Sequence, residues 1–170
     1  MITSKIDYCN SVFLGFPKTI LSKLQLILNK AARLIVGIKP WDRITPILIA
    51  LHWLPITARI EYKVCLLVFK TLKFRQPAYL CDLLIPYQNN SELSLRSSDV
   101  PYRLLEPSAV NHRVFAERVF SYTAPRLYNG LPVDIKSLDS TKLFKTKLKT
   151  HIFGFSYDTQ TLQINPKYKL

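Results

Sequence analysis

The sequence predicts a mainly α-helical fold with little β structure, on three observations. Apolar residues recur three and four positions apart over long stretches, as on one face of a helix. Glycine is rare, with 4 Gly against 11 Pro, and this disfavours an all-β protein built on tight glycine turns. The chain of 170 residues is 48% apolar, which is enough to bury a core in one domain or in two small pieces.

Four regions are expected along the chain. A helical bundle over 1–85 is followed by a polar loop over 86–100, a smaller α-rich region over 101–153 and a frayed tail over 154–170. No stretch of apolar residues is long enough to span a membrane, and the start does not resemble a signal peptide.

Glycine and proline set the bounds of the first two helices. A short helix is expected over 4–13, stopped before Pro17. A long helix is expected over 18–36, with Gly37 as its C-cap. Its apolar residues at helical spacing are Ile20, Leu24, Ile27, Ala31 and Leu34.

Three further helices complete the first region. The first is expected over 46–53 and ends at the step into Pro55, because a residue before proline avoids helical geometry. Thr57 is the expected N-cap of a longer helix over 58–74. A last short helix is expected over 78–84.

The second half gives fewer helical signals. Short extended segments are expected at 102–106 and 110–115, and one or two helical turns at 124–131. Asp139 or Ser140 is expected to cap a final helix that ends near Phe153. Its apolar stripe is Phe144, Leu148 and Ile152, and a second face carries Lys142, Lys145 and Lys149.

Residue types that build active sites are scattered. The eleven acids never stand side by side, no DxD occurs, and the four glycines stand alone, so neither a two-metal site nor a phosphate loop is indicated. The cysteines and histidines are widely spaced: Cys9, Cys65, Cys81, His52, His112 and His151. We therefore expect reduced thiols in an intracellular protein, no zinc, no cofactor and no catalytic residue. The sequence leaves open whether the compartment is the nucleus or the cytoplasm.

The charge indicates a polyanionic partner. The chain has a formal net charge of +13, and residues 1–80 hold 12 Lys and Arg against 3 Asp and Glu, a net charge of +9. Such an excess favours nucleic acid or an anionic membrane surface. A membrane surface is the weaker prediction, because the apolar faces of the expected helices are needed for a core.

Basic residues on two expected helices form stripes that suit a phosphate backbone. Arg59, Lys63, Lys70 and Lys73 fall within roughly 80° of one another at about 100° per residue. On the helix over 18–36, Lys23 and Lys30 stand on one face with Arg33 nearby. The competing interpretation is a solvated helix face, since lysines on amphipathic helices ordinarily face water.

Seven blocks, in order, resemble the C-terminal part of non-LTR (LINE-type) retrotransposon reverse transcriptases of the jockey and chicken-repeat kind. They are SKIDYCNSVFLGFP (4–17), LSKLQLILNKAARLIVG (21–37), ITPILIALHWLPITARIEYKVCLLVFKTL (44–72), PAYLCDLLIPY (77–87), LRSSD (95–99), FSYTAPRLYNGLP (120–132) and FKTKLKTHIF (144–153). The resemblance covers about residues 4–153. The chain departs from the pattern at Tyr128, where tryptophan is usual.

The resemblance implies a fragment that begins past the catalytic palm, with its metal-binding aspartates, and that contains the thumb and the region after it. The bundle over 1–85 would then be thumb-like, and in this family the thumb grips the template–primer duplex. Asp7 would be a structural or capping carboxylate of a thumb helix.

Together these observations predict a non-catalytic protein that contacts RNA or DNA through its basic helix faces, with a palm-bearing reverse transcriptase as a further candidate partner and no membrane partner. Two alternatives stay open. One is a protein-interaction or scaffold module in which SYTAPRLYNGLP (121–132) packs against a partner and the charge only keeps the chain in solution. The other is a retroelement relic without function.

Overall fold

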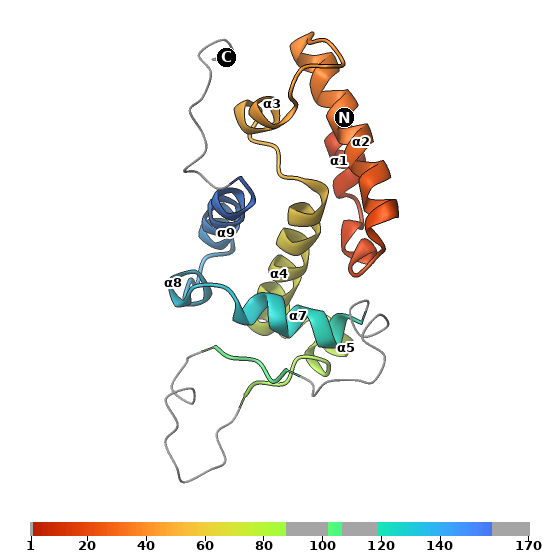
Figure 1. Cartoon of the computed structure of the whole chain (residues 1–170). Coiled ribbons are helices and arrows are strands. Elements are labelled where there is room, and N and C mark those ends of the chain that lie inside the picture. Colours follow the sequence, from red (N-terminus) through yellow and green to blue (C-terminus); the bar gives the residue numbers. More distant parts are fainter. Residues whose placement is uncertain (1, 88–101, 107–118, 158–170) are drawn as a thin grey trace. The chain divides into compact units, whose positions relative to one another are not determined.

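A computed structural model describes residues 2–87, 102–106 and 119–157 (Figure 1). Helices make up most of the described residues, and their only β pairing is an isolated antiparallel bridge between Pro86 and Leu104. The mainly α fold class is therefore confirmed. The elements are α1 (Ile2–Asp7), the 3₁₀ helix η1 (Asn10–Phe13), α2 (Lys18–Val36), α3 (Thr45–Ala50), α4 (Ile56–Phe74), α5 (Ala78–Cys81), α7 (Phe120–Asn129), α8 (Val133–Lys136) and α9 (Thr141–Ser156).

The chain divides into two compact units. The first contains residues 1–62 and 149–170, and the second contains 63–148. The helices α4 and α9 each begin in one unit and end in the other. Most of the polar loop over 86–100, the segment 110–115 and most of the tail lie outside the described residues. The start of that tail is helical, since α9 continues to Ser156.

Local sequence signals explain most of the helix bounds in the first unit. α2 has the predicted bounds, and Gly37, with a left-handed φ of 71°, ends it by donating its N–H to the Arg33 carbonyl at 2.8 Å. The expected helix over 4–13 is instead split into α1 and η1, because Cys9 has a left-handed φ of 52° that interrupts helical geometry.

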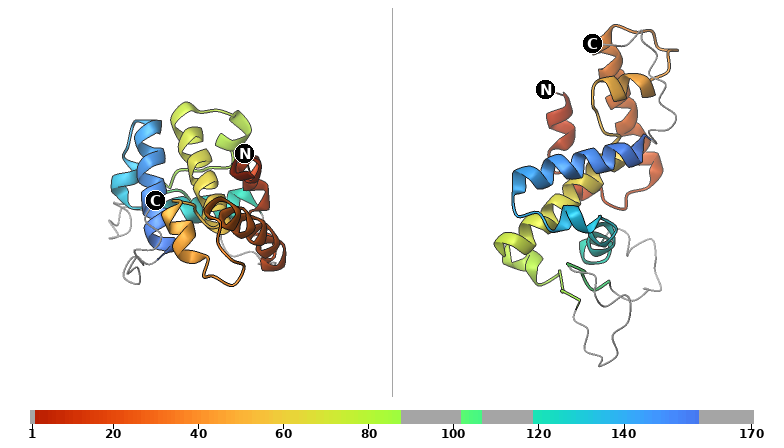
Figure 2. Two further views of the ribbon diagram at one scale, coloured as in Figure 1. Left: turned by 90° about the horizontal axis from the view of Figure 1, so that it is seen from above. Right: turned by 90° about the vertical axis from the view of Figure 1, so that its left-hand side faces the viewer.

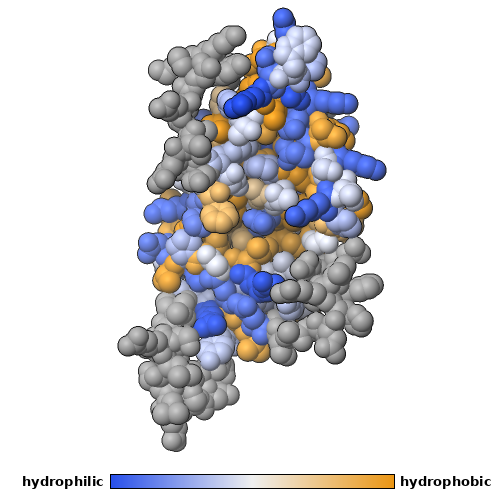
Figure 3. Space-filling model, viewed as in Figure 1, coloured by the Kyte–Doolittle hydropathy of each residue, from blue (hydrophilic) through white to orange (hydrophobic). Residues whose placement is uncertain are grey.

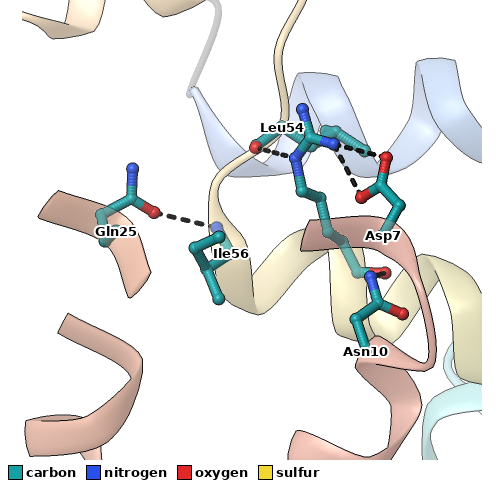
Figure 4. Close-up of polar contacts among 6 residues, drawn as sticks. Asp7, Asn10, Gln25, Leu54 and Ile56 are labelled. Atoms are coloured by element: carbon teal, nitrogen blue, oxygen red, sulfur yellow. Dashed lines mark hydrogen bonds and ion pairs between the residues drawn. The ribbon is translucent and has the colours of Figure 1, made fainter. Parts of the chain in front are cut away.

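The beginning of α4 depends on a distant side chain. The helix begins at Ile56, one residue before the expected cap Thr57. Gln25 of α2 accepts a hydrogen bond from the Ile56 N–H through Oε1 at 2.9 Å (Figure 4). Its Nε2 donates to Asn29 Oδ1 at 2.8 Å. A side chain 31 residues away therefore satisfies one of the orphan donors at this helix end.

The second unit has an aromatic core. The rings of Phe69 on α4 and Phe144 on α9 stack with centroids 3.9 Å apart and an interplanar angle of 11°. Tyr128 on α7 is 2% exposed, and burial, with smaller effects of Cys65 and Tyr102, raises its pKa to about 12. Figures 1 and 2 show α7 beside the C-terminal half of α4, in agreement with the effect of Cys65 on Tyr128.

The SYTAPRLYNGLP segment forms a longer helix than predicted, and part of it is buried. The segment forms a helix of three turns rather than one or two, because α7 begins at Phe120 and continues through Pro125. Several of its side chains are buried, whereas Leu127 is half-buried and Pro132 is exposed. Ala124, Pro125 and Tyr128 are buried within the chain's own second unit, so this segment is part of a core.

No helix in the described ranges is long and apolar enough to cross a membrane.

Candidate nucleic-acid interface

Arg59, the first residue of the predicted basic stripe, is an internal ion-pair partner. Its Nη1 lies 2.8 Å from both carboxylate oxygens of Asp7, and its Nε donates to the Leu54 carbonyl at 2.8 Å (Figure 4). The Arg59 side chain is 11% exposed. The prediction that Arg59 binds phosphate is therefore corrected, because its guanidinium is occupied by Asp7 and covered by the chain.

The surroundings of Arg59 are also internal. Asn10 Nδ2 donates a long hydrogen bond of 3.5 Å to the Arg59 carbonyl (Figure 4). The Tyr157 hydroxyl donates to the Trp53 carbonyl at 2.5 Å, and burial raises the pKa of Tyr157 to about 12, against the opposing effect of the Arg59 charge. These contacts place the Asp7–Arg59 pair within the packing of the first unit.

The rest of the α4 stripe is discontinuous. Lys70 and Lys73 are exposed, and Lys63 is half-buried. Leu66 follows Arg59 by seven residues, so at about 100° per residue its direction differs from that of Arg59 by only about 20°, yet Leu66 is 8% exposed and buried. α4 is therefore packed on nearly all sides, and its available basic surface is limited to the C-terminal half.

Lys73 keeps its access to water and ligand. Its Nζ lies 3.7 Å from Asp139 Oδ1, and the Asp139 side chain is fully exposed. Its Nζ also lies 5.9 Å from the centre of the Phe69 ring. An ion pair of this length in water contributes little, so a phosphate can replace Asp139.

On α2, two of the three predicted cations are exposed. Lys23 and Lys30 face solvent, and α2 contains no acidic residue that would neutralise them. Arg33 differs, because it is half-buried and its Nη2 donates to the Asp42 carbonyl at 3.2 Å. Arg33 therefore holds the turn that follows α2, and we no longer assign it to ligand binding.

Beside these lysines, α2 exposes apolar side chains that were expected in the core. Ile20, Ile27 and Leu34 are 41%, 51% and 80% exposed, whereas Leu28 and Ala32 are completely buried. Figure 3 shows hydrophobic and hydrophilic side chains intermixed over the region where α2 lies. The buried face is thus rotated from the predicted one, and α2 presents a mixed apolar and basic surface.

A third basic group lies on α9. Lys142, Lys145 and Lys149 are exposed, and α9 contains no acidic residue. Their three- and four-residue spacing is visible in the sequence and places them on one face, but they were not among the predicted binding residues.

The described lysines of α2 and α9 are not neutralised by ion pairs. Among the described residues, Arg59 pairs with Asp7 and Lys73 pairs with Asp139. The exposed lysines on α2, α4 and α9 therefore keep a positive potential that attracts anions.

The thiols and the potential metal ligands of the described residues do not indicate a second candidate site. The three cysteines are free thiols, exposed at Cys9, buried at Cys65 and half-buried at Cys81. No group of three potential metal ligands occurs among the residues that the structure describes.

Comparisons with family models, with curated proteins and with solved structures gave no match to this chain.

Proposed function

We propose that this chain binds RNA or DNA through the phosphate backbone and catalyses no reaction itself. The observation that carries the proposal is the exposure of Lys23 and Lys30 on a helix with no acidic residue. Lys70 and Lys73 on α4 form a separate basic group in the second unit, and the lysines of α9 are further candidates. Each lysine that neutralises a phosphate releases a counterion, so binding of this kind falls with salt.

The origin we propose is the thumb and post-thumb region of a non-LTR retrotransposon reverse transcriptase. The order and spacing of the seven sequence blocks support it. On this proposal the ligand is the template–primer duplex, and the partner protein is a polymerase that supplies the palm. The residues we assign to the grip are Lys23, Lys30, Lys63, Lys70 and Lys73, because Arg59 and Arg33 are engaged within the chain.

The test is fluorescence anisotropy of the chain with an RNA–DNA hybrid, a DNA duplex and single-stranded RNA over a salt series. We expect the logarithm of the binding constant to fall linearly with the logarithm of salt concentration. The double variants K23E/K30E and K70E/K73E should each weaken binding and make the negative slope for duplex DNA shallower by about 2, since each phosphate contact contributes about 0.9 to its magnitude.

The matched control is K5E/K39E, which changes the charge equally at exposed lysines outside the assigned helices. Equal loss of affinity in the control would mean diffuse attraction and would refute the assigned residues. No binding by the folded wild-type chain at low salt would refute the function. A variant with Arg59→Glu is unsuitable, because it would place a second carboxylate against Asp7 and destabilise the fold itself.

A protein-interaction module is the second candidate function, and the exposed apolar face of α2 favours it. Ile27 and Leu34 are each more than half exposed, as at a surface that a partner covers. Two results together would support this second function over the first. The folded chain would not bind nucleic acid at low salt, and the variant I27S/L34S would be more soluble than the wild type.

A further inference from the structure

The second unit contains a cavity that neither candidate function uses. It has a volume of about 400 Å³. It lies where α7 ends, between the segment 102–106, the last turn of α7 and the end of α8. Its lining residues are Arg103, Glu106, Arg126, Asn129, Gly130 and Lys136.

The wall of this cavity is held by the Asn129 side chain. Asn129 Oδ1 accepts from the Leu104 N–H at 2.9 Å, while Nδ2 donates to the Leu104 carbonyl at 2.9 Å and to Glu106 Oε1 at 2.8 Å. Backbone hydrogen bonds from Tyr87 N–H to the Arg103 carbonyl (3.0 Å) and from Leu105 N–H to the Ile85 carbonyl (2.8 Å) fix the same segment. The cavity is therefore built into the fold before any ligand arrives.

Lys136 is the feature that points to a ligand. The residue is only 4% exposed, and among the described residues its ammonium group makes one hydrogen bond, to the Asn129 carbonyl at 3.2 Å. An ammonium group has three N–H donors, and a buried charge without partners is costly. Burial, with the repulsion of Arg103, lowers the pKa of Lys136. The charged form of its ammonium group is therefore destabilised in the protein without a ligand.

Positive charges also outnumber negative ones among the other described residues that line the cavity. Arg126 is exposed, its guanidinium lies 5.5 Å from the centre of the Tyr122 ring, and no carboxylate of the described residues pairs with it. The Arg103 guanidinium lies 5.2 Å from the centre of the Tyr87 ring. Among the described residues of the lining, three cations and the carboxylate of Glu106 give a net charge of +2. The Glu106 carboxylate already accepts a hydrogen bond from the Asn129 side-chain amide in the wall of the cavity.

We infer that this cavity binds a phosphate group as its dianion, with Lys136 and Arg126 as the main donors. A dianion matches the net charge of the lining, supplies acceptors for the remaining N–H groups of Lys136, and accepts hydrogen bonds from a guanidinium edge. Phosphate is close to doubly charged at neutral pH, since its second pKa is about 6. The group has two possible sources, free inorganic phosphate or a phosphate monoester such as a nucleoside 5′-monophosphate. The inference is independent of the proposed function, because it uses none of the lysines assigned to the nucleic-acid surface.

The test is titration of the full chain with inorganic phosphate, a nucleoside 5′-monophosphate and the unphosphorylated nucleoside, at constant ionic strength held with chloride. Calorimetry gives the affinities, and the backbone amides of Gly130 and Lys136, followed by ¹H–¹⁵N NMR, locate the site. We expect at least one phosphate compound to bind and the nucleoside not to bind. Binding of inorganic phosphate alone would identify a free-phosphate site, and tighter binding of the monophosphate a monoester site.

Two variants and a matched control decide the outcome. R126Q removes an exposed cation of the cavity, K136M removes the buried ammonium but keeps the apolar stem, and K145Q removes an exposed cation of α9 outside the cavity. We expect R126Q and K136M to weaken binding about tenfold or more, the scale of a lost charge-assisted hydrogen bond, and K145Q to bind as the wild type. Because Arg126 is exposed, R126Q tests the site even where K136M fails to fold. No binding of either phosphate compound, wild-type affinity in R126Q, or equal losses in all three variants would overturn the inference.

Discussion

Asp7 and Arg59, 52 residues apart in the chain, form an ion pair in which one guanidinium nitrogen lies 2.8 Å from both carboxylate oxygens. The pair joins the last residue of α1 to the first turn of α4. Arg59 is 11% exposed and Asp7 is 47% exposed, so the positive partner is the more deeply buried of the two. The Asp7 carboxylate, which neutralises the buried guanidinium of Arg59, is therefore itself in contact with water.

Replacing Asp7 by Asn should destabilise the chain by about 2 kcal/mol, between the values for exposed and buried pairs. The change keeps the side-chain shape but leaves the Arg59 charge without its partner. Urea denaturation followed by circular dichroism measures it. In a double-mutant cycle, R59M should remove most of the effect of D7N, because the charge that needs a partner is then gone. D139N is the control, since its exposed pair with Lys73 should contribute nothing measurable. Equal effects of D7N with and without Arg59 would contradict the role of the pair.

The orientation of α2 predicts very different effects for two leucines of one helix. Leu28 is completely buried, so L28A should cost about 3 kcal/mol through lost apolar contacts and a cavity. Leu34 is 80% exposed, so L34A should change the free energy of unfolding by less than about 0.5 kcal/mol. Both values come from urea denaturation of the single variants. A large loss in L34A would mean that the predicted apolar stripe, and not the observed one, faces the core.

Thr71 predicts a stabilising substitution. The residue is 1% exposed, and its hydroxyl has no hydrogen-bond partner among the described residues. T71V replaces the hydroxyl by a methyl group of similar size and should raise the free energy of unfolding by about 1 kcal/mol, since a buried polar atom without a partner is costly. The measurement is the denaturant midpoint at unchanged slope. T71S, which keeps the hydroxyl and removes a methyl group, should be less stable than the wild type. A loss of stability in T71V would show that the hydroxyl has a partner after all.

Glu61 predicts a dependence of stability on pH. Burial raises its pKa above the ordinary value of 4.5, so the native state binds this proton more tightly than the unfolded state does. The stability from this group is therefore fully present below 4.5 and is lost as pH rises through the pKa of the folded state. E61Q cannot ionise, so relative to the wild type it should be more stable near neutral pH than at about pH 4. Denaturation at both pH values measures the difference, and a difference that does not change with pH would contradict the burial of an ionisable Glu61.

Much of the helical layout follows from the sequence alone. Pro17, Gly37 and Pro55 mark where α2 and α4 begin or end, because proline and glycine restrict or free the backbone at the residue itself. The excess of positive charge and the absence of clustered acids are likewise properties of the chain that need no folding. α7 was predicted too short, since packing of Ala124 and Tyr128 in the core outweighs the hydrogen bond that Pro125 cannot donate.

What the sequence by itself determined is the mainly α class, most helix positions and the basic character of α2 and α4. Only the tertiary structure decided which of those basic residues reach solvent and which apolar face of α2 is buried. The physical reason is that helical periodicity gives the angles between side chains around one helix but not the direction of the helix toward its neighbours. Arg59 and Lys70 point within about 20° of each other on α4 at about 100° per residue. Yet Arg59 pairs with Asp7, 52 residues earlier in the chain, whereas Lys70 is exposed to water.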